Sequence, residues 1–180
     1  IITPSTPVAV NIRRASAAVC TPPLPITGIC RSCLIRASKA QSDRAYGFVR
    51  AADELESIAD YVYSFSSYMK RLDKHELDFS EDAWKDLMNY HQEVMNFFSL
   101  VCSAFNNEDI SSTKQIYSEA SRLNDLADEV RKAHLDRMKS GACSALPALT
   151  FSDMAVALRR IKNHTVNLHE ALISELAHAA

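Results

Sequence analysis

Apolar residues recur at alternating steps of three and four along four long stretches of this chain. This spacing places them on one stripe of an α-helix, and such a stripe packs against partner helices. Only three glycines occur among 180 residues, too few for the many tight turns of an all-β protein. The sequence therefore predicts an all-α fold, an antiparallel bundle of about four long helices joined by short links.

The first two helices are predicted from their apolar seams and from one helix cap. The first runs from about Leu34 or Ser42 to Leu72, and its inward seam contains Phe48, Ala51, Leu55, Ile58, Val62, Phe65, Met69 and Leu72. Ser80 is the predicted N-cap of the second, because Glu81 and Asp82 follow it where the helix dipole favours anions. Its seam contains Trp84, Leu87, His91, Val94, Phe98, Val101 and Phe105.

The last two helices are predicted in the same way. The third begins near Asp109 or Ser111, ends at a left-handed Gly141, and buries Ile116, Ala120, Leu123, Leu126, Val130, Ala133 and Met138. The fourth begins at a capping box, Thr150-x-x-Asp153, and buries Met154, Leu158, Ile161, Thr165, Leu168, Leu172 and Leu176. We expect one core in which the helices meet through Leu55, Ile58, Val94, Phe98, Val130 and Ile161.

Residues 1–33 differ from the rest of the chain in composition. They hold Pro4, Pro7, Pro22, Pro23 and Pro25, show no sustained hydrophobic period, and precede the first acidic residue of the chain. We expect an irregular, basic leader or linker there, followed by a helical domain over residues 34–180. Cys30-x-x-Cys33 has no second Cys or His pair at zinc-site spacing, so incidental thiols are the favoured interpretation.

Charge argues against nucleic acid as a partner, and hydropathy argues against a membrane-spanning helix in this chain. The body of the chain is acidic, which argues against nucleic acid, because phosphate backbones are bound by basic faces. No apolar run of about 18 residues is present, so no membrane-spanning helix is predicted in this chain. A homodimer remains open.

The first helix carries a dense group of carboxylates in Ala52-Asp53-Glu54-Leu55-Glu56-Ser57-Ile58-Ala59-Asp60. Asp53, Glu56 and Asp60 are predicted to lie on the outward stripe, opposite the apolar seam. This stretch resembles the Glu-x-x-x-Asp signature of PhoU-like domains, with Glu56 and Asp60 at the signature positions. The resemblance implies that these acids bind metal on the outer face of the bundle.

Two later segments carry the same resemblance. Leu123 to Met138 is similar to the penultimate helix of the PhoU-like tails of sodium/phosphate cotransporters. Ser152 to Glu170 resembles the second PhoU signature, in which Arg-Ile-x-x-His precedes a small residue and an Asn. Its ligand positions are Arg159 and Asn163, where a metal-binding repeat has acids. We therefore expect at most a weakly bound iron or zinc ion at Glu56, Asp60 and Asp53, with Asp125 and Glu129 as further candidates.

Catalytic patterns are missing from the sequence. It has no nucleophile elbow and no phosphate-cradling glycine loop. His91, on the seam of the second helix, is interpreted as structural, and so are His134 and His164. The resemblance implies a non-enzymatic, cytoplasmic regulatory or interaction domain of a sodium/phosphate cotransporter-type protein, at the inner face of the membrane. Its partner would be the transporter's membrane domain or another phosphate-system protein. The alternatives are a free-standing, metal-binding PhoU-type regulator and a purely structural helical bundle.

Overall fold

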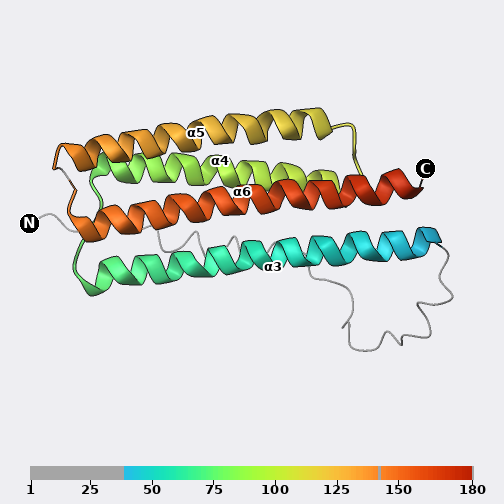
Figure 1. Ribbon diagram of the computed structural model, residues 1–180, viewed down its shortest axis with the longest axis horizontal. Helices are drawn as coiled ribbons and strands as arrows, with labels where there is room; N and C mark the ends of the chain where they lie inside the picture. Colours follow the sequence, from blue (N-terminus) through green and yellow to red (C-terminus); the bar gives the residue numbers. More distant parts are fainter. Residues whose placement is uncertain (1–38, 142, 180) are drawn as a thin grey trace, which may run out of the picture. The chain divides into compact units, whose positions relative to one another are not determined.

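The computed structural model describes residues 39–141 and 143–179, with backbone alone for 39–41, 43, 44 and 175–179. The described residues form four long helices and no strand: α3 (Lys39–Lys74), α4 (Glu81–Asn106), α5 (Thr113–Lys139) and α6 (Ala145–Ala179). Successive helices run antiparallel, as Figure 1 shows. The predicted all-α, four-helix bundle is confirmed. The predicted leader, residues 1–33, and its Cys30-x-x-Cys33 lie outside the described residues.

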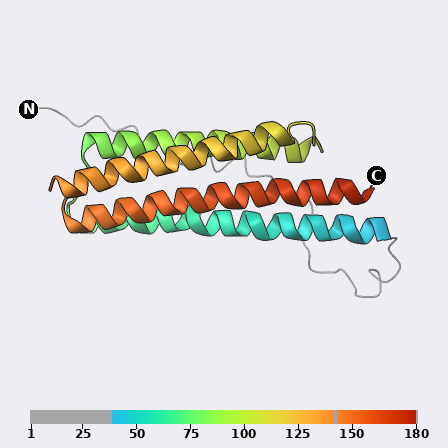
Figure 2. The same cartoon turned by 45° about the horizontal axis from the view of Figure 1, so that its top comes forward.

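Helix α6 is the centre of the bundle. It packs against α3, α4 and α5, while the main packing partner of α3 is α6. Figures 1 and 2 both show α3 beside α6, with α4 and α5 paired on the other side of α6. As a consequence, α6 is buried around much of its circumference, whereas α3 is covered mainly along one stripe. No helix of the described residues is both long and apolar enough to cross a membrane.

Two predicted helix ends are confirmed. The Ser80 hydroxyl accepts a hydrogen bond from the Ala83 backbone N at 3.3 Å, and Glu81 and Asp82 occupy the first turn of α4. Gly141 follows α5 with φ +73°, a left-handed conformation that glycine adopts without strain. These local signals fix where the link before α4 ends and where the link after α5 begins.

The predicted start of the fourth helix is wrong. Helix α6 begins at Ala145, so Thr150 lies inside it, is fully buried, and donates its hydroxyl to the Leu146 carbonyl at 2.8 Å. Pro147 lies in the first turn, where a missing backbone N–H costs no intrahelical hydrogen bond. The helix therefore starts before the proline, and Asp153 pairs with Arg71 of α3 at 2.6 Å instead of capping.

The inward stripe of α3 is displaced from the predicted seam. Ala51, Ile58, Phe65 and Leu72 face the bundle as predicted, but the positions between them do not. Phe48, Leu55, Val62 and Met69 are 50%, 41%, 56% and 40% exposed. The inward positions in their place are Gly47, Glu54, Tyr61 and Tyr68, which are buried or half-buried. Hydrophobicity favoured the wrong set because the true contact positions include a glycine, a glutamate and two tyrosines.

The same one-residue displacement affects half of the α4 and α5 seams. In α4 the fully buried positions include Tyr90, Phe97 and Ala104 instead of His91, Phe98 and Phe105, and in α5 Ala127 and His134 replace Leu126 and Ala133. Ile58, Val94, Val130 and Ile161 meet in one core, while Phe98 packs at its edge. The described part of the α6 seam, Met154 to Leu172, is buried as predicted.

Candidate functional site

The predicted acidic stripe lies on the outer surface of α3. Asp53, Glu56 and Asp60 are all exposed, in agreement with their outward prediction. The nearby serines bond only to the helix backbone: the Ser57 hydroxyl donates to the Asp53 carbonyl at 3.0 Å, and that of Ser64 to the Asp60 carbonyl at 2.9 Å. The three carboxylates therefore face solvent at successive turns.

This acidic stripe does not fit a multinuclear metal cluster. In the described part of the chain, no three His, Cys, Asp or Glu side chains gather where they could hold one ion. Arg159 and Asn163, which occupy the matching positions of the second signature, are exposed on α6 and offer no carboxylate. Asp125 and Glu129 are exposed on α5 and do not join the stripe. A weak single ion at Glu56 and Asp60 stays a prediction.

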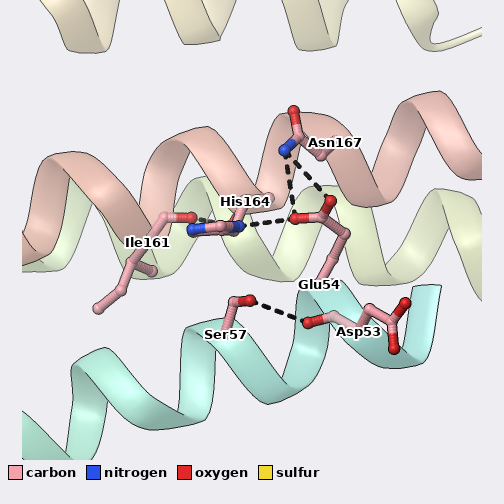
Figure 3. Close-up of polar contacts among 7 residues, drawn as sticks. Asp53, Glu54, Ser57, Ile161, His164 and Asn167 are labelled. Carbon is pink, nitrogen blue, oxygen red and sulfur yellow. Dashed lines mark hydrogen bonds and ion pairs between the residues drawn. The ribbon is translucent and has the colours of Figure 1, made fainter. Parts of the chain in front are cut away.

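A polar cluster joins α3 to α6 on the inward side of α3, within the same signature segment. The Glu54 Oε2 lies 2.7 Å from His164 Nδ1, and the Asn167 amide donates to both Glu54 oxygens at 3.2 Å. Figure 3 shows the Glu54 carboxylate directed toward α6, while that of Asp53 is turned away. Because an ionised carboxylate only accepts hydrogen bonds, His164 Nδ1 carries the hydrogen in this arrangement.

Burial makes this cluster a strong link. The Glu54 side chain is 18% exposed and that of His164 is 25% exposed. Removing a carboxylate from water is costly unless donors replace the lost hydration, and here two side chains of α6 do so. The ring of Tyr61, one of the inward positions of α3, lies 5.7 Å from the His164 ring and covers one side of it.

The two signatures place equivalent residues at this contact, although neither singles out Glu54. Placing the first signature over the second, Glu56 over Arg159, puts Tyr61 at the position of His164. The structure brings these two equivalent positions together across the α3–α6 interface. Glu54 was missed because a glutamate beside Leu55 was not expected to occupy the inward position.

A cavity of about 120 Å³ lies where α4 and α6 begin and α5 ends. His134 and Arg137 line it together with Asp78, Cys143 and Phe151. Arg137 Nη1 donates to Asp86 Oδ2 at 2.7 Å, whereas its Nε and Nη2 are buried without a hydrogen-bond partner among the described residues. Two carboxylates, Asp78 and Asp86, offset the single guanidinium. The cavity therefore lacks the positive excess that a phosphate site needs, and its size suits a few water molecules.

The buried titratable side chains His134 and Lys162 have structural partners. The His134 ring stacks on Phe151 at 4.4 Å, and its Nε2 lies 3.1 Å from the Ala148 carbonyl oxygen. Burial lowers the pKa of His134, and also lowers the pKa of Lys162, whose amine donates to Asn124 Oδ1 at 2.8 Å. These contacts tie α5 to α6 inside the core.

Comparison with known proteins gives one family match. The PhoU domain family matches residues 87–172, from the second turn of α4 to the last third of α6. No curated protein and no solved structure matches the chain. The matched range contains the second signature, with His164 and Asn167, but not the acidic stripe of α3. The match covers a little under half of the chain, and together with the four-helix fold it supports a PhoU-like domain in this bundle.

Proposed function

We propose that the chain is the cytoplasmic, PhoU-like regulatory domain of a sodium/phosphate cotransporter-type protein and acts through protein contacts, without catalysis. The PhoU domain match supports a role in phosphate homeostasis. The observation that carries the proposal is the junction between the two signature helices. His164 and Asn167 of the second signature hold Glu54, which lies within the first.

This junction would allow the domain to transmit a signal. Helix α3 is held mainly by α6, so a change at their interface would move the outer surface of α3 relative to the rest of the bundle. That surface carries the acidic stripe and large exposed apolar side chains. Both are suited to contact with another protein, and the membrane domain of a phosphate transporter, at the inner face of the membrane, is the partner we propose.

A specific observation favours one alternative function. Asp53, Glu56 and Asp60 keep the acidic character of the first PhoU-type signature and remain exposed. A free-standing, metal-binding PhoU-type regulator that contacts a transporter or a sensor kinase would use such a surface. The two functions differ in what the domain contacts.

Phosphate uptake by cells that lack the gene tests the proposal. Cells with the gene disrupted should take up radiolabelled phosphate but lose the decrease in uptake that follows a shift to high external phosphate. The wild-type gene should restore that decrease. Uptake that responds normally to phosphate in the disrupted cells would contradict the proposal.

The partner can be identified by site-specific photo-crosslinking. A photoreactive residue in place of Tyr63, which is 75% exposed on α3, samples the outer surface of α3 without disturbing the core. Cross-linking to a sodium/phosphate cotransporter is the expected result. Cross-linking to a sensor kinase alone would instead favour the free-standing regulator.

A further inference from the structure

Two hydrogen bonds tie the start of α5 to the last part of α6. The His169 side chain of α6 is fully buried, and its Nε2 lies 3.1 Å from Thr113 Oγ1. Thr113 is the first residue of α5, and its hydroxyl donates to the Ile110 carbonyl at 2.7 Å. Ile110 belongs to the link between α4 and α5. The series His169, Thr113 and Ile110, which we name the α5 latch, therefore connects this link to the core of the bundle.

The α5 latch fixes which nitrogen of His169 carries the hydrogen. A hydroxyl has one hydrogen, and that of Thr113 is donated to Ile110, so Thr113 Oγ1 accepts from the His169 Nε2–H. Nδ1 of the neutral ring is then an acceptor, and it is buried with no hydrogen-bond partner among the described residues. A second proton would bind at Nδ1, where no acceptor receives it. The closed latch therefore favours the neutral ring.

The surroundings of the ring oppose its protonation. Burial lowers the pKa of His169, and the charges of Glu170 on α6 and Asp109 in the link raise it by less. The Tyr117 ring of α5 meets the imidazole edge-on, with the ring centroids 6.1 Å apart. Asp109 has nearer partners, because its Oδ1 accepts from the Ser111 amide and hydroxyl at 2.8 and 2.6 Å. Neither carboxylate bonds to Nδ1, so a second proton requires the ring to move.

The link that the α5 latch holds contains a strained residue. Glu108 has φ +50°, a left-handed conformation that is unfavourable for a residue with a Cβ. The Thr113 backbone N also donates to the Ile110 carbonyl, at 3.2 Å, so this one oxygen receives both the main chain and the side chain of Thr113. Release of Thr113 from His169 therefore loosens the link and the first turn of α5 together.

We propose that the α5 latch is an acid-sensitive switch, which holds the α4–α5 link against α6 while His169 is neutral and releases it when the ring binds a second proton. Above the ordinary histidine pKa of about 6.5 the ring is neutral in both states, and the closed state has its full stability. Below this value the open state binds the proton and the closed state does not, so opening increases as the pH falls. One proton allows an increase of at most about tenfold per pH unit.

Amide hydrogen exchange of Ile116, whose N–H donates to the Ser112 carbonyl at 2.9 Å in the first turn of α5, measures the opening. Its protection is compared at about pH 7.5 and pH 5.5, after correction for the intrinsic pH dependence of exchange, and should fall by about three- to tenfold in acid. His169→Gln keeps a side-chain donor for Thr113 but binds no proton, so the fall should disappear. His134→Gln is the matched control, because it removes a buried histidine that contacts the start of α6, and it should keep the wild-type fall.

Nitrogen NMR of the imidazole rings tests the latch in the unaltered chain. At neutral pH the ¹⁵N shifts should place the hydrogen of His169 on Nε2, and the ring should titrate at a lower pH than a histidine of an unfolded chain. A hydrogen on Nδ1 at neutral pH, an Ile116 protection that does not change with pH, or a fall that persists in His169→Gln would overturn the proposal. The switch does not depend on the proposed role in phosphate uptake, so the two can fail separately.

Discussion

Glu54 on α3 and His164 on α6 are 110 residues apart in sequence, yet Glu54 Oε2 lies 2.7 Å from His164 Nδ1. The pair occupies an inward heptad position of α3 whose neighbours along the stripe, Ala51 and Ile58, are buried apolar residues. This contact and the Arg71–Asp153 ion pair interrupt a largely apolar α3–α6 interface, and they fix which residues face each other, because a displaced register leaves their charges unpaired. The alignment of α3 along α6 is therefore set by these two polar contacts together.

The first prediction concerns the free energy of this contact. Glu54→Ala should lower the free energy of unfolding by about 1.5–3 kcal/mol, because it removes a hydrogen-bonded carboxylate and leaves His164 and Asn167 without their acceptor. Chemical denaturation of Glu54→Ala, His164→Ala and the double variant measures it. The double-mutant cycle should give a coupling energy of about 1 kcal/mol. Glu56→Ala, an exposed neighbour, should change stability by less than about 0.5 kcal/mol, and a coupling near zero would contradict the prediction.

The second prediction separates two adjacent phenylalanines. Phe97 is 3% exposed in the core, whereas Phe98 is half-buried at its edge. Phe97→Ala should cost about 3–5 kcal/mol of unfolding free energy, because it removes buried area and leaves a cavity. Phe98→Ala should cost clearly less, since part of its ring already contacts water. Urea denaturation of the two variants compares them, and a larger loss for Phe98→Ala would show that the α4 helix is rotated from its described orientation.

The fold was predictable from sequence because the hydrophobic period, the caps and the length of a helix depend on residues that are close in sequence. The spacing of apolar residues, Ser80 at the start of α4 and Gly141 after α5 each specify one feature of the chain without reference to its partners. The rotation of each helix was only half predictable. Positions such as Ala51 and Ile58 belong to both possible stripes, and the choice between Leu55 and Glu54 depends on which helix lies alongside.

The polar cluster could not be predicted for the same reason. A carboxylate becomes an acceptable inward residue only when donors from another helix replace its hydration, and His164 and Asn167 are more than 100 positions away. The outward orientation of Glu56 and Asp60 was predictable, because no partner is required to leave a charge in water. The start of α6 was placed too late because the capping-box pattern at Thr150 was preferred to the proline-in-first-turn signal at Pro147.

The third prediction concerns stability in mild acid. Burial lowers the pKa of His134 and of His169. There is therefore a pH range in which both are neutral in the folded chain although the same histidines of an unfolded chain already bind protons. The unfolded state therefore takes up more protons below its own histidine pKa of about 6.5, and stability falls as the pH is lowered from there toward the folded pKa values. Above that range these two residues should give no pH dependence.

Urea denaturation between about pH 5 and pH 8 measures this effect, within the range where histidine titrates. The unfolding free energy of the wild type should decrease on the acid side. His134→Gln and His169→Gln should each reduce that decrease, by at most about 1.4 kcal/mol per pH unit for each histidine removed. If neither variant alters the acid-side slope, the loss of stability arises from other groups.

The final prediction concerns metal at the acidic stripe. Glu56 and Asp60 lie one turn apart with Asp53 beside them, all exposed, so a divalent or trivalent cation would relieve their mutual repulsion. No third side chain from another helix joins them in the described part of the chain, and we expect any bound iron or zinc to be weak and mononuclear. Elemental analysis of protein purified without chelator measures it.

The double variant Glu56→Gln with Asp60→Asn should remove whatever metal the wild type carries. Asp125→Asn with Glu129→Gln is the matched control, because it neutralises two exposed acids one turn apart on α5 and should leave the metal content unchanged. Tightly bound metal that survives the first double variant would place the site elsewhere. Equal, negligible metal in all three proteins would identify the stripe as an acidic surface that is solvated and binds no ion.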